Sequence, residues 1–417
     1  MNYNLLICSL FLAYIAPMIL HDHVAYASHP KSAIDEITLK ILDECAEKNT
    51  SPLKGKGSNQ SIARFKNYIH QNSGRIGQLA CGLFTFTPSK TPKEQDSKEQ
   101  GIWTAEQLSG YCKRYRIDPF LNWLKKNYTP QSEFSFLCLL EEPYCGTWYI
   151  EQQVQDELSE LLDTCPLLTS CNHPDLPWTK KCILIPDFNI LYSGFHQEIG
   201  NLLSAEIYPS KEHLSASVKK GFVSFTQRDA KLYFRGALTG AKRPFSLENI
   251  SQNPRHYALT LLPIYPYMDF KITSFMEVCK IASESPFYEY LFQNFSHLIT
   301  EQVDFFEHGK YKYLLSCDGF GAAWGRPQLI MATGSVLFMN AQCEQYFYSL
   351  MKAGQTYIVI NKDFSNLDAE FKRLEALPDL AEKIGLQGKQ FVHQFCTEPA
   401  IDAYLWLVLN KLENQFN

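Results

Sequence analysis

Asp187 is the first side chain whose position suggests chemistry. It follows Cys182 to Pro186, a short apolar run typical of a buried parallel strand that brings its last residues to the edge of a sheet. A carboxylate there can act as a general base and remove a proton from a hydroxyl group. An Asp after Pro is also a common helix cap or turn former. The local pattern leaves both roles open.

A glycine-rich loop from Cys317 to Arg326 is the second candidate. The residues from Tyr311 read as a strand before it, and Pro327 and Gly334 suit the start and end of a short helix after it. Free N–H groups at a helix start favour an anion, and Arg326 can add a two-pronged phosphate contact. A plain turn is the alternative, which geometry alone does not exclude.

A basic loop follows a strand predicted from Lys231 to Arg235. It offers cationic and hydroxyl donors, and a solvated surface loop is the alternative. The sequence contains no Asp-x-Asp pair, through which two carboxylates could hold a divalent cation beside a diphosphate, and no Cys-x-x-Cys pair. We therefore expect no metal and no other cofactor, so cationic side chains would have to neutralise a phosphate group.

Four segments of the chain together resemble glycosyltransferase family 90. They are Ile185 to Phe188, Leu232 to Gly236 with the Thr and Arg that follow, Lys310 to Val336, and Tyr346 to Leu367. The family includes capsule-associated xylosyltransferases, protein O-glucosyltransferases and lipopolysaccharide glycosyltransferases. The similarity covers roughly Cys182 to Leu412 and does not reach the first 150 residues.

The resemblance implies an inverting, metal-independent enzyme that moves a sugar from a UDP-sugar to a hydroxyl group. Glucose and xylose are the sugars that it favours. The acceptor would be a glycan or a protein serine. It also implies an α/β fold with two Rossmann-like domains facing a central cleft, the GT-B type. Asp187 corresponds to the catalytic base and Arg326 to the diphosphate-binding arginine. The other donor-binding positions fall on Arg235, Gly236, Thr239, Arg243, Gly319, Gly321 and Ser335.

Two regions depart from the family pattern. Tyr192 to His196 lacks the acidic residue and the proline that usually follow the catalytic strand, and the acidic residues expected before Phe347 are displaced, with Glu344 nearby. Both regions bear on recognition of the acceptor or the sugar. A non-catalytic relative that binds a sugar or a nucleotide sugar is therefore the alternative.

The length of 417 residues predicts two domains, because one core rarely serves so long a chain. We expect an N-terminal extension and an acceptor-side domain at residues 28–220, and a donor-binding domain at residues 221–395. Residues 396–417 would form a helix that can pack back on the first domain. The extension reads as helical and cysteine-containing up to about Cys112, with a mobile surface loop at residues 88–100.

An apolar run from Leu5 to Leu20 precedes Ala25-Tyr26-Ala27, which predicts a signal peptide at residues 1–27. An uncleaved anchor is the alternative, and only then would the chain contact a membrane. The predicted location is the periplasm, the secreted fraction or a secretory-pathway lumen. One of the thirteen cysteines lies in this segment, and the even remainder favours disulfides, with buried free thiols as the alternative. The net charge of −5, without a long basic run, argues against a nucleic-acid partner.

Overall fold

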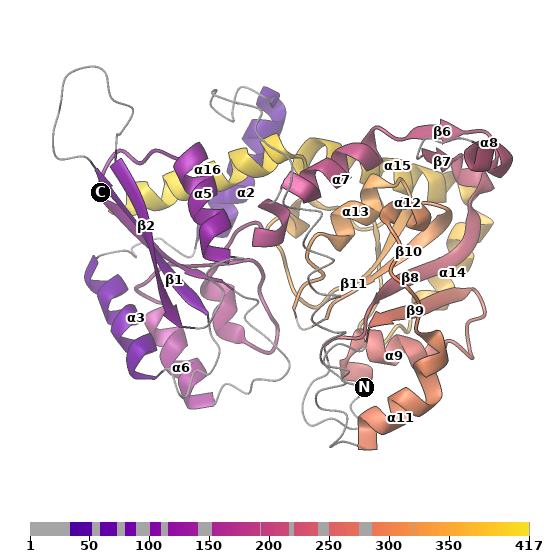
Figure 1. Ribbon diagram of the computed structural model, residues 1–417, viewed down its shortest axis with the longest axis horizontal. Coiled ribbons are helices and arrows are strands. Elements are labelled where there is room, and N and C mark those ends of the chain that lie inside the picture. The colour runs from indigo at the N-terminus through magenta and orange to yellow at the C-terminus, as the bar shows by residue number, and fades with distance from the viewer. Residues whose placement is uncertain are drawn as a thin grey trace, which may run out of the picture.

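The computed structural model shows a mixed α/β protein with two five-stranded sheets and a small parallel pair of strands. The two large sheets lie side by side with helices around them (Figure 1). The structure describes residues 34–51, 59–72, 80–88, 101–109, 116–140, 152–191, 193–216, 221–240, 250–274, 286–319 and 321–416. The predicted signal peptide, residues 89–100 of the predicted surface loop, and Arg243 lie outside these ranges.

The first sheet has the strand order β2-β1-β3-β4-β5. Its strands are β1 (Cys81–Pro88), β2 (Gly101–Ser109), β3 (Phe134–Leu139), β4 (Leu167–Thr169) and β5 (Ile183–Leu184). Strand β1 pairs antiparallel with both β2 and β3, whereas β3, β4 and β5 run parallel. This sheet is therefore mixed and differs from the Rossmann-like sheet expected for the first half.

The N-terminal extension is only partly helical. Helices α2 (Glu36–Thr50) and α3 (Asn59–Gln71) agree with the prediction, but β1 and β2 form a hairpin where more helix was expected. In β1 the side chains of Phe84 and Phe86 are buried, while the alternate positions are partly or fully exposed. A period of two with aromatic residues favours a strand. The prediction of a helical extension is thus wrong for residues 81–87 and 101–109.

The second sheet is parallel throughout and has the order β12-β11-β10-β8-β9. Its strands are β8 (Asp229–Ala237), β9 (Met268–Ser274), β10 (Tyr311–Cys317), β11 (Val336–Asn340) and β12 (Ile358–Val359). The chain runs from β8 outward to β9 and then returns to the other side of β8. In doubly wound sheets, ligands bind beyond the carboxyl ends of the strands where the order reverses. Here that point lies between β8 and β10.

Helices cover both faces of the second sheet. One buried cluster joins Leu314 of β10 to residues of α13 (Arg326–Ala332) and α15 (Pro378–Phe395). Another joins Leu315 to residues of α9 (Pro254–Leu261) and α14 (Leu367–Ala376). The remaining α-helices and the parallel pair of short strands are α5 (Asp118–Asn127), α6 (Gln152–Leu161), α7 (Ser193–Leu203), α8 (Lys211–Ala216), α11 (Pro286–Phe295), α12 (Phe305–His308), α16 (Glu398–Phe416), β6 (Glu206–Tyr208) and β7 (Gly221–Val223).

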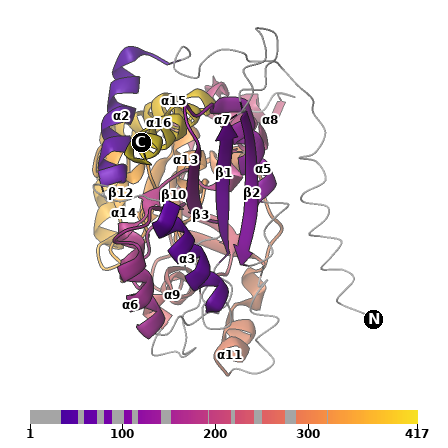
Figure 2. The ribbon, with the colours of Figure 1, turned by 90° about the vertical axis from the view of Figure 1, so that its left-hand side faces the viewer.

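Helix α16 packs on the first half of the chain. It lies against α2 (Figure 2). Trp123 of α5 donates a hydrogen bond of 2.7 Å to Asp402 of α16. The same hydrophobic cluster contains residues of α16, of the first sheet and of one face of the second sheet, so both sheets share a core. The boundaries proposed for two separate domains stay a prediction.

The cysteines that the structure describes are free thiols rather than disulfides. They are Cys45, Cys81, Cys138, Cys165, Cys171, Cys182, Cys317, Cys343 and Cys396. All are buried, and burial raises the pKa of the Cys81 and Cys138 thiols, which disfavours the reactive thiolate. Among these nine residues the disulfide prediction is not borne out, while Cys112, Cys145 and Cys279 lie outside the described ranges.

Within the described ranges, no helix is both long and apolar enough to cross a membrane. The apolar run at residues 5–20 lies outside them.

Candidate functional site

Asp187 lies just beyond the carboxyl end of β5, at the start of the 3-10 helix η6 (Phe188–Leu191), and is 4% exposed. Its Oδ1 accepts hydrogen bonds from the backbone N–H of Asn189 at 2.8 Å and from the Asn189 side-chain amide at 2.7 Å. No residue that the structure describes donates a hydrogen bond to Oδ2. One oxygen thus forms the turn, and the other can accept a proton, so the two roles considered for Asp187 are compatible.

Arg116 reaches Asp187 from the residues just before α5. Its Nη1 lies 3.6 Å from Asp187 Oδ1, which is an ion pair but longer than a good hydrogen bond. The guanidinium carbon also lies 5.9 Å from the ring centroid of Phe188 and 5.8 Å from that of Trp324. Trp324 belongs to the glycine-rich loop, so Arg116 links this loop to Asp187. No sequence pattern singled out Arg116.

Arg326 begins α13 and crosses the end of β8. A Cβ atom on Gly236 would lie 2.8 Å from Arg326 Nη2, so a side chain at this position would displace the guanidinium. The Arg326 guanidinium carbon lies 4.8 Å from the ring centroid of Phe234. Helix α13 has only seven residues, so its dipole is short and the charge of Arg326 carries most of the expected attraction for an anion.

The glycine-rich loop and the loop after β8 touch at the switch point. The N–H of Gly319 donates a 3.1 Å hydrogen bond to the carbonyl oxygen of Gly321. A Cβ atom on Gly319 would lie 2.5 Å from Thr239 Oγ1, and one on Gly240 would lie 2.3 Å from the Gly319 carbonyl oxygen. The structure therefore brings together Gly236, Thr239, Gly319, Gly321 and Arg326, five of the residues predicted to bind the donor, and that role stays a prediction.

Arg255, near the start of α9, connects these two loops. Its Nη1 donates to the Ala237 carbonyl oxygen at 2.9 Å and to Thr239 Oγ1 at 2.8 Å. Its Nε and Nη2 donate to the Cys317 carbonyl oxygen at 3.2 and 3.1 Å. The sequence analysis missed this residue, because its partners are distant in sequence. The Pro254 helix start beside it was the only local signal.

Arg235 has a different environment from Arg326. Its Nη2 donates to Asp269 Oδ1 at 2.8 Å, and its guanidinium carbon lies 4.1 Å from the ring centroid of Tyr233. These contacts join β8 to β9, so Arg235 has a structural role, and its part in donor binding stays a prediction.

Burial, helped by the charges of Arg326 and Arg235, lowers the pKa of His308 to about 3, so this histidine is neutral at neutral pH.

Ser335 lies at the amino end of β11, whereas the loops that hold Gly236, Thr239 and Gly319 lie at the carboxyl edge of the sheet. Its hydroxyl group donates to the Tyr311 carbonyl oxygen at 2.7 Å and accepts from Arg228 Nη1 at 2.9 Å. The structure does not bring Ser335 to the predicted donor site. A matching motif aligns a residue with a position in the family sequence, but it does not tell at which edge of the sheet the side chain lies. Arg243 lies outside the described residues.

The loops at the carboxyl edges of the two sheets meet each other. Asn172, after β4, and Glu344, after β11, exchange backbone hydrogen bonds of 2.9 and 3.3 Å. Asp318 Oδ2 accepts from the backbone N–H groups of Gln342 and Cys343 at 2.6 and 2.8 Å, which connects the loops after β10 and β11. Burial raises the pKa of Asp318 to about 6, although these hydrogen bonds oppose the shift. Asp187 and Arg326 thus belong to one junction between the sheets.

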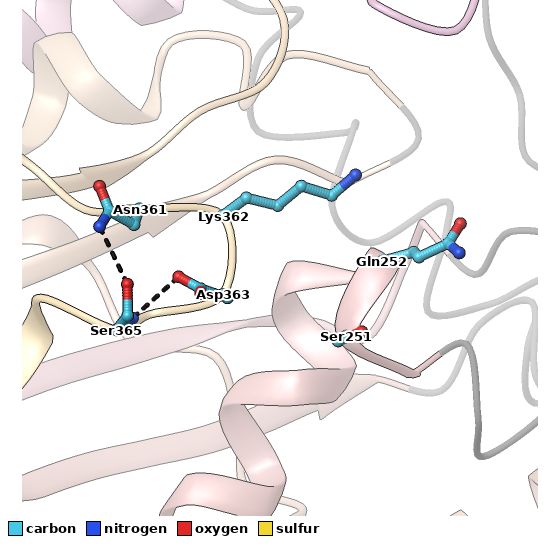
Figure 3. A pocket seen from close by; sticks show the side chains of 6 residues that line it. All are labelled: Ser251, Gln252, Asn361, Lys362, Asp363 and Ser365. Carbon is cyan, nitrogen blue, oxygen red and sulfur yellow. Dashed lines mark hydrogen bonds between the residues drawn. The ribbon is translucent and has the colours of Figure 1, made fainter.

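A polar pocket of about 580 Å³ lies near the ends of β12 and the 3-10 helix η8 (Ile250–Gln252) (Figure 3). It is lined by Ser251, Gln252, Asn361, Lys362, Asp363 and Ser365. The Lys362 side chain extends from the β12 loop toward the side where Gln252 lies. None of the predicted site residues lines this pocket, and the sequence analysis did not identify it.

Alanine substitutions at two glycines with positive φ can test how closely the loop after β8 packs against the glycine-rich loop. Gly240 has φ 94° and Gly354 has φ 73°, but a Cβ atom at Gly354 would meet nothing within 4 Å. Alanine at either position incurs the left-handed backbone cost of about 1 kcal/mol. Only Gly240→Ala also collides with the Gly319 backbone, so we expect it to lose roughly 3 kcal/mol of unfolding free energy against about 1 for Gly354→Ala. Denaturant melts measure both, and equal losses would contradict the close approach of the loops.

Known proteins with similar sequences are glycosyltransferases. The family described as "Glycosyl transferase family 90" matches residues 150–415. Protein O-glucosyltransferase 3 of Mus musculus is 28% identical over 109 residues, 26% of this chain and 22% of the relative. Protein O-glucosyltransferase 1 of Homo sapiens is 21% identical over 271 residues, 61% of this chain and 63% of the relative. The matched part of the chain thus spans less than two thirds of each of these relatives.

One solved structure with weak similarity is a glycosyltransferase from Rickettsia africae ESF-5. It is 11% identical and covers 64% of this chain and 81% of that chain, with a TM-score of 0.29. A score this low does not establish how the two halves are arranged, so the GT-B type stays a prediction.

Proposed function

Because the chain belongs to glycosyl transferase family 90, we propose that it is an inverting glycosyltransferase that moves a sugar from a UDP-sugar to a hydroxyl group. The transferred sugar is glucose or xylose, and the acceptor is a glycan or a protein serine. The names of the relatives, protein O-glucosyltransferases, favour glucose and a protein acceptor. Export through residues 1–27 is part of the same proposal, as is the GT-B arrangement.

The carboxylate of Asp187 is the observation that carries this proposal. Its Oδ1 is held by Asn189, which fixes the group, while Oδ2 has no hydrogen-bond donor among the described residues. In the proposed reaction Oδ2 takes the proton of the acceptor hydroxyl, and the hydroxyl oxygen attacks the anomeric carbon from the face opposite UDP. The bond from that carbon to the diphosphate breaks, and its electron pair leaves with UDP. One carboxylate therefore suffices for inversion.

Arg326 is the proposed partner of the departing diphosphate. Its position over Gly236, beside the loops that Arg255 connects, supports this assignment. A fixed guanidinium stabilises charge that grows on the leaving group without the need to reorganise solvent. Thr239, against which Gly319 packs, is held by the hydrogen bond that it accepts from Arg255.

We expect hydrolysis of UDP-glucose or UDP-xylose without acceptor, and sugar transfer, to persist in excess EDTA. The physical reason is that Arg326 would supply the neutralising charge that a divalent cation supplies elsewhere. Within the described ranges no group of three or more His, Cys, Asp or Glu side chains is placed to hold a metal. UDP release, measured in a coupled assay with EDTA and with added Mn²⁺, checks the expectation. Activity that EDTA abolishes and Mn²⁺ restores would contradict it.

A non-catalytic, nucleotide-sugar-binding relative is the second candidate. The departures at residues 192–196, together with the structural contacts of Arg235 and Ser335, favour it. Such a protein would bind a UDP-sugar and be stabilised by it, yet release no UDP. The assay above therefore separates the two candidates.

A further inference from the structure

Trp324 has an unusual backbone conformation within the glycine-rich loop. Its φ of 45° lies in the left-handed region, which is costly for a residue with a side chain. The neighbouring position 325 has no room for a side chain, because a Cβ atom on Gly325 would lie 2.3 Å from the ring of Phe195. The Trp324 side chain is 46% exposed, so its burial offsets little of this cost. Strained and exposed residues of this kind concentrate at functional sites.

The backbone around Trp324 is held by hydrogen bonds to its neighbours. Gln345 Nε2 donates a 2.9 Å hydrogen bond to the Trp324 carbonyl oxygen, and the Arg326 N–H donates one of 3.0 Å to the Ala323 carbonyl oxygen. The backbone of Trp324 is thereby held two positions before the proposed diphosphate-binding arginine. Its indole ring contacts the guanidinium of Arg116.

Arg116 places a buried polar atom, Nη1, near Trp324 and Asp187. Its side chain is 14% exposed, and Nη1 makes no hydrogen bond with any residue that the structure describes, although Asp187 Oδ1 is 3.6 Å away. A buried N–H group without an acceptor costs free energy that a ligand oxygen can recover. The following helix is held against η6 through Phe120, whose ring centroid lies 5.3 Å from that of Phe188. Arg116 is thus positioned by the core.

We propose that Trp324, Arg116 and Asp187 form a subsite for a pyranose ring. The inference deepens the proposed function and rests on it. An indole face packs against the apolar C–H face of a pyranose, while guanidinium N–H groups donate to its hydroxyl oxygens. Binding sites for small ligands combine an aromatic surface with a few fixed polar groups in the same way.

The subsite includes a part of the chain outside the family match. Arg116 precedes residue 150, where that match begins, whereas Asp187 and Trp324 lie inside it. The first part of the chain therefore does more than stabilise the fold: it supplies a ligand contact. The occupant is either the transferred sugar of the donor or a sugar of the acceptor, and both present the same ring chemistry.

The test uses the full chain with Trp324→Ala, Trp324→Gly, Trp324→Phe and Arg116→Met. Trp324→Gly removes the ring and relieves the backbone strain, so it stays folded even where the alanine variant does not. Phe292→Ala is the control, because Phe292 is a similarly exposed aromatic residue, 54% exposed, on the remote helix α11. The measurements are dissociation constants for methyl glucoside, methyl xyloside, UDP and UDP-glucose, and KM for the acceptor.

We expect the Ala, Gly and Met variants to bind the methyl glycosides about 10-fold more weakly, with UDP affinity unchanged. Phe292→Ala should stay near the wild type, and Trp324→Phe, which keeps a smaller aromatic face, should lose less affinity than the Ala and Gly variants. If the donor sugar occupies the subsite, UDP-glucose affinity falls and KM for its hydrolysis rises. If an acceptor sugar occupies it, hydrolysis is unchanged and only KM for the acceptor rises.

Two results would overturn the subsite: wild-type binding of glycosides, UDP-glucose and acceptor by all these variants, or a loss of UDP affinity equal to the loss of glycoside affinity. The second would mean that Trp324 only shapes the phosphate loop. Failure of the proposed function has a different signature. In that case the wild type turns over no UDP-sugar but still binds the glycosides in a Trp324-dependent way.

Discussion

Asp187→Asn is expected to slow sugar transfer by roughly 100-fold or more, while UDP affinity and melting temperature stay near those of the wild type. Asparagine keeps the shape of the side chain, and its Oδ1 can still accept the two hydrogen bonds from Asn189. What it loses is the ability of the second oxygen to take a proton at neutral pH. The variant therefore keeps the turn at residues 187–189 and loses the general base.

A product assay, a UDP titration and a thermal melt on one preparation measure this effect. Asp35→Asn is the matched control, because Asp35 Oδ1 also accepts a backbone N–H, that of Thr38 at 2.9 Å, in an N-cap outside the proposed site. Near-normal transfer by Asp187→Asn would reduce Asp187 to a turn former. Should Asp187→Asn fail to fold, Asp187→Glu, which keeps a carboxylate, tests whether transfer follows the position of the base.

Arg326→Ala is expected to weaken UDP binding by about 2 kcal/mol, or roughly 30-fold, and to slow transfer by at least as much. The guanidinium would make charged hydrogen bonds to the diphosphate, and these strengthen as charge develops on the leaving group. A methyl group offers neither charge nor donor. Calorimetric titration with UDP and steady-state transfer rates separate the two effects.

Arg326→Lys keeps the charge and most of the stem that packs against Phe234, but it loses the two-pronged geometry, so an intermediate effect is expected. Arg373→Ala serves as a control, since Arg373 forms a surface ion pair with Glu370 on α14. UDP binding by Arg326→Ala equal to that of the Arg373→Ala control would place the phosphate site elsewhere.

Local signals predicted the elements on either side of the glycine-rich loop well. The strand expected from Tyr311 onward is β10, and the short helix expected after the loop is α13. Pro327 lies in the first turn of α13, and Gly334 follows its end with φ 75°, the conformation that glycine takes past a helix. Helix α6 likewise buries Val154 and Leu158, which are four positions apart, the spacing of one face of an amphipathic helix. In each case the determining contacts are close in sequence.

The remaining features depend on contacts between distant residues. The hairpin of β1 and β2 needs partners in β3, and the reading of this region as helix gave too little weight to its alternating pattern. Arg255 donates to Cys317, which is 62 positions away, and Arg116 lies against Asp187, which is 71 positions away, and no local pattern reports such contacts. Ser335 shows the converse error, because a matching motif did not reveal that its hydroxyl group is used by Tyr311 and Arg228.

The position of α16 bears on the order in which the chain can fold as it is made. Its Tyr404 hydroxyl group donates to the Leu184 carbonyl oxygen at 2.7 Å, and its buried Glu413 accepts from the backbone N–H groups of residues 131 and 132. Residues 398–416 leave the ribosome after all the elements that they cover. Proteins with separate domains usually fold the N-terminal one first during synthesis. Here the first sheet is made early but is completed by contacts with α16, so its folding ends after translation has passed the second sheet.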